Sequence, residues 1–169
     1  MTTVRRSPAP DLRRARTAVV VSFLTNGTAF ASVAGRTPAI RDSLDLSTVG
    51  LGLLLLCLSA GAVAGLPLAG PLVHRIGAGR VVLSGGALVG AGFGGLSVGL
   101  ATGSLLAAQA GLVAAGLGMG SWDVAMNVEG ADVERRLGNS LMPRLHGAFS
   151  LGTVAGAGVG LGCVAFDLP

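Results

Sequence analysis

Long apolar stretches alternate with short charged segments along almost the whole chain. Five stretches carry few or no charged side chains, at about residues 17–35, 49–69, 81–101, 105–128 and 145–166. A helix needs ~20 mostly apolar residues to cross the hydrocarbon core of a bilayer. Each stretch is close to that length. The pattern therefore predicts an all-α membrane protein with five transmembrane helices.

A short basic segment, residues 70–80, joins the second and third apolar stretches. It is too short to cross a bilayer, so it predicts a turn between two antiparallel helices. Arg75 and Arg80 lie in this turn. Because cytoplasmic loops of membrane proteins carry an excess of Arg and Lys, we expect the turn to face the cytoplasm.

Composition agrees with a membrane protein. The chain has 169 residues, of which 51% are hydrophobic and 12% are charged, whereas soluble domains have about 25% charged residues. The net charge of +4 comes from arginine without lysine. Since the arginines lie in the N-terminal segment and the loops, we interpret them as topology signals and expect no nucleic-acid partner. Cys57 and Cys163 lie within apolar stretches and are expected to pack as small buried thiols.

The first 16 residues are predicted to form a basic cytoplasmic tail. They hold five arginines and one acid, and Pro8 and Pro10 disfavour helix there. A secretory signal is an alternative, because Ala29, Phe30 and Ala31 resemble a cleavage site. The apolar stretch is longer than a usual signal core, which favours a retained span. The connector at 36–46 has balanced charges, as expected of an outside loop, and Ser47 after it can cap the second span. Residues 132–144 are expected to form a charged inner loop.

Glycines recur at four-residue spacing in two of the predicted spans. In such spans they lie on one helix face and allow another backbone to approach closely. We therefore expect a tightly packed helix bundle. The two sets are Gly86, Gly90 and Gly94, extended by Gly95 and Gly99, and Gly152, Gly156 and Gly160.

Asp123 and Asn127 are the polar pair of the fourth predicted span. They are four residues apart, so they share one helix face. An ionisable residue within a span is a functional candidate, and Asp123 is a candidate for a proton pathway. The alternative is an interfacial carboxylate that pairs with Arg75 or Arg80.

Two further polar residues are candidates for the substrate or proton pathway. Asn26 lies in the first span, where it either bonds another helix or lines a cavity. His146 opens the fifth span.

An enzyme is not expected. The sequence offers no nucleophile–base set, no His/Cys metal cluster and no phosphate-binding loop, and two predicted spans lie between His74 and His146. We therefore predict no catalytic residues, metal or cofactor.

The turn at residues 70–80 resembles the signature turn of the major facilitator superfamily (MFS), G-x-L-A-D-R-x-G-R-R/K. His74 replaces the Asp of that signature, on which a charge relay depends in the family. Four positions match the signature: Gly70, Leu72, Arg75 and Gly77. Arg80 stands one position after the place of the basic pair in the signature.

Two further segments, residues 123–127 and 146–152, look like the fucose–proton symporter branch and the YbjJ-type permeases. The resemblance implies that an acid of that branch, at the position of Asp123, serves proton coupling. It also implies that a glutamine of that branch, at the position of His146, helps to hold sugar. An acid of its first span falls at Ala34 here. Ala157 follows Gly156, so the Gly-Pro pair of the drug–proton antiporters is missing.

The resemblance implies an incomplete six-helix MFS N-terminal domain at residues 17–169, with the C-terminal half absent. The implied function is that of a fragment of a secondary active transporter for a small polar, sugar-like solute, with proton coupling as one option. The implied partners are the lipid bilayer, the solute and the missing half. A bacterial plasma membrane with a cytoplasmic N-terminus is the expected location. The alternatives are a non-transporting packing or assembly protein and a drug or metabolite efflux fragment.

Overall fold

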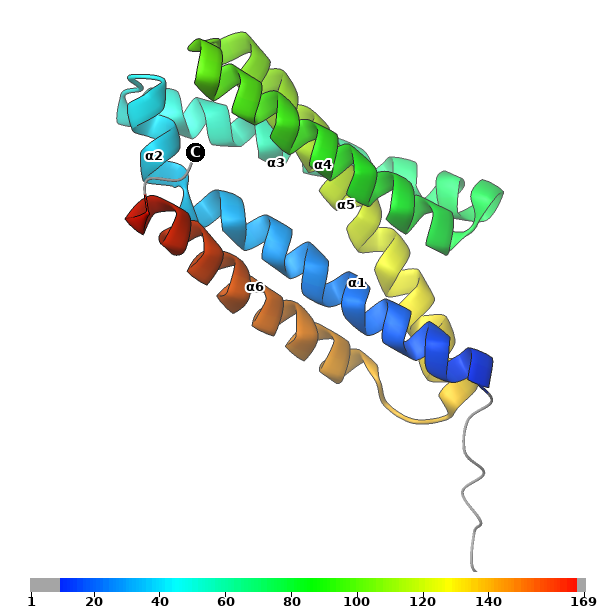
Figure 1. Ribbon diagram of the computed structural model, residues 1–169. Helices are drawn as coiled ribbons and strands as arrows, with labels where there is room; N and C mark the ends of the chain where they lie inside the picture. Colours follow the sequence, from blue (N-terminus) through cyan, green and yellow to red (C-terminus); the bar gives the residue numbers. More distant parts are fainter. Residues whose placement is uncertain (1–9, 167–169) are drawn as a thin grey trace, which may run out of the picture.

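The computed structural model describes residues 10–166, and all regular structure in that range is α-helical (Figure 1). This confirms the all-α prediction. The helices are α1 (Pro10–Gly35), α2 (Thr37–Ser43), α3 (Thr48–Ile76), α4 (Ala78–Thr102), α5 (Leu105–Leu137) and α6 (Met142–Ala165).

Four of the helices in the described part are long and apolar enough to cross a membrane, namely α1, α3, α4 and α5. The prediction of five is therefore too high by this measure. The fifth predicted span corresponds to α6, which has 24 residues. The connector at 36–46 is not a plain loop either, because α2 forms within it, with Pro38 in its first turn, where proline is tolerated.

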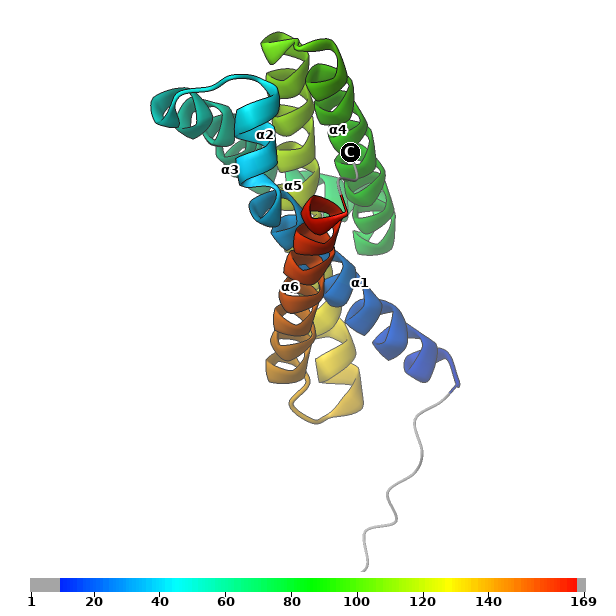
Figure 2. The ribbon, with the colours of Figure 1, turned by 60° about the vertical axis from the view of Figure 1, so that its left-hand side comes forward.

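The long helices form two groups that share α5. In one group α5 packs along both α3 and α4, and in the other α1 packs along α6. The far half of α5 crosses α1, and this crossing joins the two groups (Figures 1 and 2). Direct contacts between α5 and α6, and between α1 and α4, are few.

The predicted basic turn is largely helical. α3 continues through Pro67 and Pro71 to Ile76, and α4 begins at Ala78, so Gly77 alone forms the joint. Its φ of +85° is a conformation that suits glycine. The turn was predicted too long because the charged residues of segment 70–80 lie on helix ends and not in a loop.

Two other helices extend into segments that were predicted to be charged tail or loop. α1 already begins at Pro10, so residues 10–16 are helical; the first residue of a helix tolerates proline because its N–H is unsatisfied there. Residues 1–9 of the predicted tail lie outside the described residues. α5 reaches Leu137, and only residues 138–141 separate it from α6. Ser47 accepts a hydrogen bond from the Gly50 N–H (3.1 Å) and caps α3 as predicted.

Glycines carry the contacts between the long helices. A methyl group added at Gly116 would overlap the backbone oxygen of Leu58 in α3, and one at Gly152 would overlap that of Leu24 in α1. Such close approach allows backbones to pack where lipid provides no hydrophobic driving force between helices.

The predicted glycine face is correct in α6 and partly wrong in α4. Gly156 and Gly160 lie against α1, whereas Gly90 and Gly94 have no neighbour within 4 Å. α4 instead meets α5 through glycines seven residues apart, since a period of seven keeps one face along a packed neighbour. These are Gly85, Gly92 and Gly99.

Two clusters of buried apolar side chains lie toward opposite ends of the bundle. The first joins α1, α5 and the start of α6, and the second joins α1, α2, α3, α4 and the start of α5. Both α1 and α5 contribute to each cluster. Phe23 and Leu145 are fully buried in the first, and Leu54 and Leu112 in the second.

We expect Gly116→Ala to lower the free energy of unfolding in detergent by about 1–3 kcal/mol, the usual cost of overpacking. The added methyl group would meet the α3 backbone. Gly90→Ala is the matched control, because its methyl group would meet open space. It should leave stability unchanged or raise it by roughly 0.5–1 kcal/mol through helix propensity. Equal effects of both variants would contradict the packing interpretation.

Candidate functional site

Asp123 and Asn127 occupy the middle of the longest helix, α5. The Asp123 side chain is exposed and that of Asn127 is half-buried. They share a face as predicted, but the hydrogen bond between them runs from the Asn127 amide nitrogen to the backbone oxygen of Asp123 (2.9 Å). The Asp123 carboxylate is therefore not engaged by its neighbour. With 33 residues, α5 is about 50 Å long and exceeds the ~30 Å hydrocarbon core.

His146 lies one turn into α6, with an exposed side chain. Its Nδ1 is 3.0 Å from the backbone oxygen of Met142. Its ring contacts that of the buried Phe23 from α1, with a centroid distance of 5.6 Å and an interplanar angle of 60°. The imidazole also lies within electrostatic range of the Asp123 carboxylate. The fold thus brings together two sequence-predicted residues from different helices.

Glu134 holds the start of α6. Its Oε2 accepts hydrogen bonds from the backbone N–H groups of Leu141 and Met142, both at 2.6 Å. The first N–H groups of a helix have no hydrogen-bond partner within the helix, so a carboxylate there can accept from them. Its negative charge also interacts favourably with the positive end of the helix dipole.

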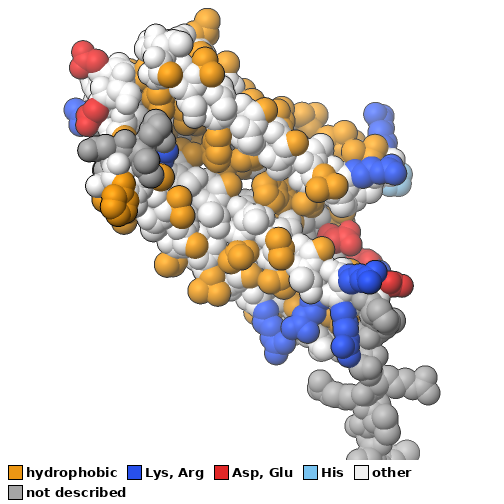
Figure 3. Space-filling view, in the orientation of Figure 1, with side chains coloured by type: hydrophobic (Ala, Val, Ile, Leu, Met, Phe, Trp, Pro, Cys, Tyr) orange, Lys and Arg blue, Asp and Glu red, His pale blue; other side chains and the backbone are white. Residues whose placement is uncertain are grey.

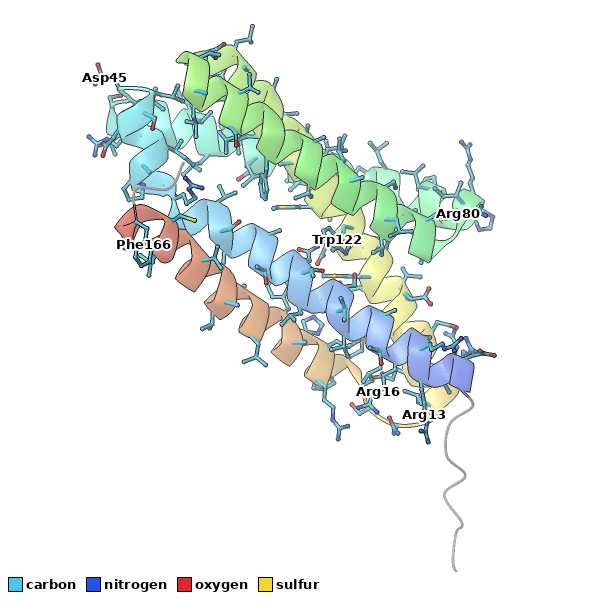
Figure 4. All side chains as sticks on the ribbon, viewed as in Figure 1. Arg13, Arg16, Asp45, Arg80, Trp122 and Phe166 are labelled. Atoms are coloured by element: carbon cyan, nitrogen blue, oxygen red, sulfur yellow. The ribbon has the colours of Figure 1, made fainter. Side chains whose placement is uncertain are left out.

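Three polar side chains are buried in the described part of the chain, and all three lie in α1 or α5 near the crossing: Ser22, Asn26 and Ser121. The indole N–H of Trp122 donates to the Ser22 hydroxyl (2.7 Å), which links α5 to α1 (Figure 4). Asn26 lies one turn beyond Ser22 on the same face of α1. It is buried, and its amide nitrogen has no hydrogen-bond partner, so the expected bond from that nitrogen to another helix is not formed.

Two cavities lie between the helix groups. One, of about 740 Å³, is bordered by α1, α4 and α5 and lined mainly by apolar side chains together with Ser22, Trp122 and Glu129. The other, of about 490 Å³, lies among α1, α2, α4 and α6 and includes Arg36. The four sequence-predicted pathway residues line neither cavity.

The expected pairing of Arg75 or Arg80 with an acid of α5 is not found. Within residues 10–166 the ion pairs join Asp132 to Arg135 and Arg136, on α5 itself. Basic side chains at the α3–α4 joint project outward from the surface, at the same end of the bundle as the start of α1 (Figure 3). Gly70 has no neighbour within 4 Å, so of the two glycines that match the signature only Gly77, through its positive φ, is required by the geometry. Leu72 is exposed on α3.

Sequence reasoning missed Phe23, Ser22, Trp122 and Glu134. The first three look like ordinary span residues until α1 and α5 are seen to cross. Glu134 was assigned to a charged loop, although an acid eight residues before a helix start is also compatible with a cap. No group of three or more metal-ligating side chains occurs among the described residues.

Three curated bacterial proteins are similar to this chain. An uncharacterized MFS-type transporter of Yersinia pestis is 35% identical over 138 residues, which is 82% of this chain and 35% of that protein. An uncharacterized transporter of Sinorhizobium fredii is 34% identical over 89% of this chain and 39% of its own length. The membrane protein MosC of Rhizobium meliloti is 29% identical over 87% of this chain.

The chain spans between 35% and 39% of the length of these relatives. No family model matches it, and no solved structure matches it. Two relatives are transporters by name, which supports the MFS resemblance at this coarse level. Together with the apolar helices, the relatives indicate a transporter-like, multi-pass membrane protein.

The Trp122–Ser22 hydrogen bond should couple α5 to α1 energetically. Ser22→Ala removes the acceptor of the half-buried Trp122 indole N–H, and a hydrogen bond of this kind is worth about 0.5–1.5 kcal/mol. In a double-mutant cycle with Trp122→Phe, we expect a coupling energy of about 0.6 kcal/mol, the average for hydrogen bonds between membrane helices. Ser97→Ala is the control, because the Ser97 hydroxyl bonds only to its own helix. Additive effects of the two substitutions would show that the bond contributes nothing.

Proposed function

We propose that this chain forms the N-terminal part of a secondary active transporter of the MFS type. In this proposal the solute is small, polar and sugar-like, it moves by alternating access, and protons drive the transport. The observation that carries the proposal is the exposed Asp123 carboxylate on the long apolar helix α5, on the face that also carries Asn127 and within electrostatic range of His146 on α6. Two relatives named as transporters give independent support.

Asp123 is the proton-responsive group in this proposal. Its carboxylate is exposed on the α5 face that carries Asn127, and no ion pair joins it within residues 10–166. A carboxylate without a fixed cationic partner can take up and release protons, whereas one paired with arginine stays charged. His146 presents a second exchangeable group nearby. Asn127 and Asn26 are the polar side chains proposed to complete the pathway.

A non-transporting packing or assembly protein remains the alternative that the glycine contacts favour, because close backbone packing alone needs no acid on a span. Such a protein would be indifferent to the charge of Asp123. An efflux permease for drugs or metabolites is the second alternative, and only the identity of the transported solute distinguishes it from a sugar-type carrier.

The remaining part of the transporter is a proposed partner, since the relatives are more than twice as long as the matched region. The two apolar cavities beside α1 and α4 are surfaces that further helices would cover. Reading the genomic DNA beyond Pro169 would show whether such helices are encoded.

Asp123→Asn should abolish proton-driven uptake by the complete reading frame that contains this chain, while solute exchange without a proton gradient persists. The substitution removes the exchangeable proton but keeps the size of the side chain. His146→Gln should reduce uptake and alter its pH profile. Asp45→Asn is the matched control, because it neutralises another exposed acid. The backbone of Asp45 has a positive φ, which asparagine also tolerates. Wild-type uptake with unchanged pH dependence in Asp123→Asn would leave Asp123 as a surface charge only.

Orientation is proposed from charge. Arg13 and Arg16 of α1 and Arg80 of α4 lie toward one end of the bundle and Asp45 lies toward the other (Figure 4). By the positive-inside rule the arginine end faces the cytoplasm of a bacterial plasma membrane, and the N-terminus lies on that side.

In a background without Cys57 and Cys163, a thiol reagent that cannot cross the membrane should label Ser43→Cys in intact cells and should label Gly79→Cys only after permeabilisation. Both positions are exposed, and Ser43 ends α2 whereas Gly79 lies at the start of α4, so the two sites report opposite ends of the bundle. The reverse labelling pattern would invert the proposed topology.

A further inference from the structure

Beyond its first turn, α6 makes few contacts with α5. Residues 138–141 form the whole connection between the two helices. Gly138 ends α5 with a φ of +65°, and the buried Leu141 belongs to the apolar cluster at that end. The placement of α6 relative to α5 is therefore decided close to this connection.

A single carboxylate oxygen bridges the connection. Glu134 Oε2 accepts from the N–H groups of both Leu141 and Met142, which are among the donors that α6 itself leaves unsatisfied. Hydrogen bonds to an ionised acceptor are stronger and shorter than those between neutral groups. This pair of bonds thus fixes the first residues of α6 to the last turns of α5.

The same first turn holds the imidazole of His146. A backbone carbonyl can only accept, so in the contact with the Met142 oxygen at 3.0 Å the Nδ1 of His146 must donate. In the neutral ring this places the proton on Nδ1 and leaves Nε2 as the nitrogen with a free lone pair. The tautomer of His146 thus depends on where the Met142 carbonyl lies.

Asp123 and Glu134 lie on the same rigid helix. Eleven residues separate them, which is about three turns, so both side chains project from a similar side of α5. A series of contacts follows: Glu134 holds the N–H of Met142, the C=O of Met142 holds His146, and His146 lies within electrostatic range of Asp123.

We propose that Glu134 is a positioning residue for the Asp123–His146 pair. Its carboxylate sets the start of α6 and, through the Met142 carbonyl, the orientation and tautomer of His146. This inference rests on the proposed function for its meaning in transport. The contacts that it describes can be tested on the 169-residue chain alone.

The test is NMR spectroscopy of the chain in detergent micelles, with ¹⁵N labelling of backbone and histidine. Wild-type His146 should show the Nδ1–H tautomer, and the Leu141 and Met142 amides should be protected from exchange. Glu134→Ala should speed exchange of these amides by roughly fivefold or more, the factor that loss of a helix cap is worth, and should shift His146 toward a mixture of tautomers. Glu134→Gln, which keeps the shape and a weaker acceptor, should give intermediate values.

Two internal controls separate positioning from general destabilisation. His74 lies at the distant α3–α4 joint, so its signals should not change in any Glu134 variant. Glu129→Gln neutralises another α5 carboxylate that lines a cavity and does not cap α6, and it should leave His146 unchanged. An unchanged His146 tautomer in a folded Glu134→Ala variant would overturn the proposal, as would equal changes at His74 and His146.

Failure of the proposed function would look different. If Asp123→Asn left transport unchanged while Glu134→Ala still altered the His146 tautomer, Glu134 would position His146 in a protein that does not use the pair for protons. If Asp123→Asn abolished coupling and Glu134→Ala left the His146 tautomer intact, the transport proposal would hold and the positioning role would be wrong.

Discussion

Close approach of helix backbones at glycine is the constraint on which this fold depends. Apolar side chains gain little by leaving lipid for another helix, so dispersion contacts between well-fitted surfaces must hold the bundle together. At Gly116, Gly120 and Gly61 the α3 and α5 backbones are so near that a methyl group would overlap a carbonyl oxygen. The same arrangement at Gly152 and Gly156 joins α6 to α1.

This constraint divides the chain into two tightly packed groups that share little surface. α5 belongs to the first group and crosses α1 of the second, where Trp122 and Ser22 form a hydrogen bond between helices. The cavities beside α1 and α4 lie where the groups separate. The crossing is thus both the main connection between the groups and the place where buried polar atoms gather.

The candidate site lies on the exposed side of the same crossing. Asp123 neighbours Trp122 in the sequence, and Phe23, which contacts the His146 ring, neighbours Ser22. Residues that join α1 and α5 therefore lie next to residues that carry or contact the candidate functional groups. A change in how α1 packs against α5 would therefore also change the positions of Asp123 and His146.

The length and spacing of apolar stretches were enough to predict an all-helical membrane protein and several helix starts, such as Ser47 before α3 and Leu105 of α5. These features are local, because they depend on the burial of one continuous segment in lipid and on hydrogen bonds within one turn. Helix ends were predicted less well. Charged residues at 70–76 and 132–137 were assigned to loops, although a helix can extend beyond the hydrocarbon core and place its charges in water.

The amino-acid sequence by itself also determined which residues have useful chemistry, including Asp123, Asn127 and His146. Only the tertiary structure decided which of them meet. The approach of His146 to Asp123, the Phe23–His146 contact and the Glu134 cap all join separate helices, and the spacing of residues along one helix contains no information about its neighbour. The glycine face of α4 shows the same limit: Gly90 and Gly85 look equivalent in the sequence, and only the position of α5 makes Gly85 a contact and leaves Gly90 free.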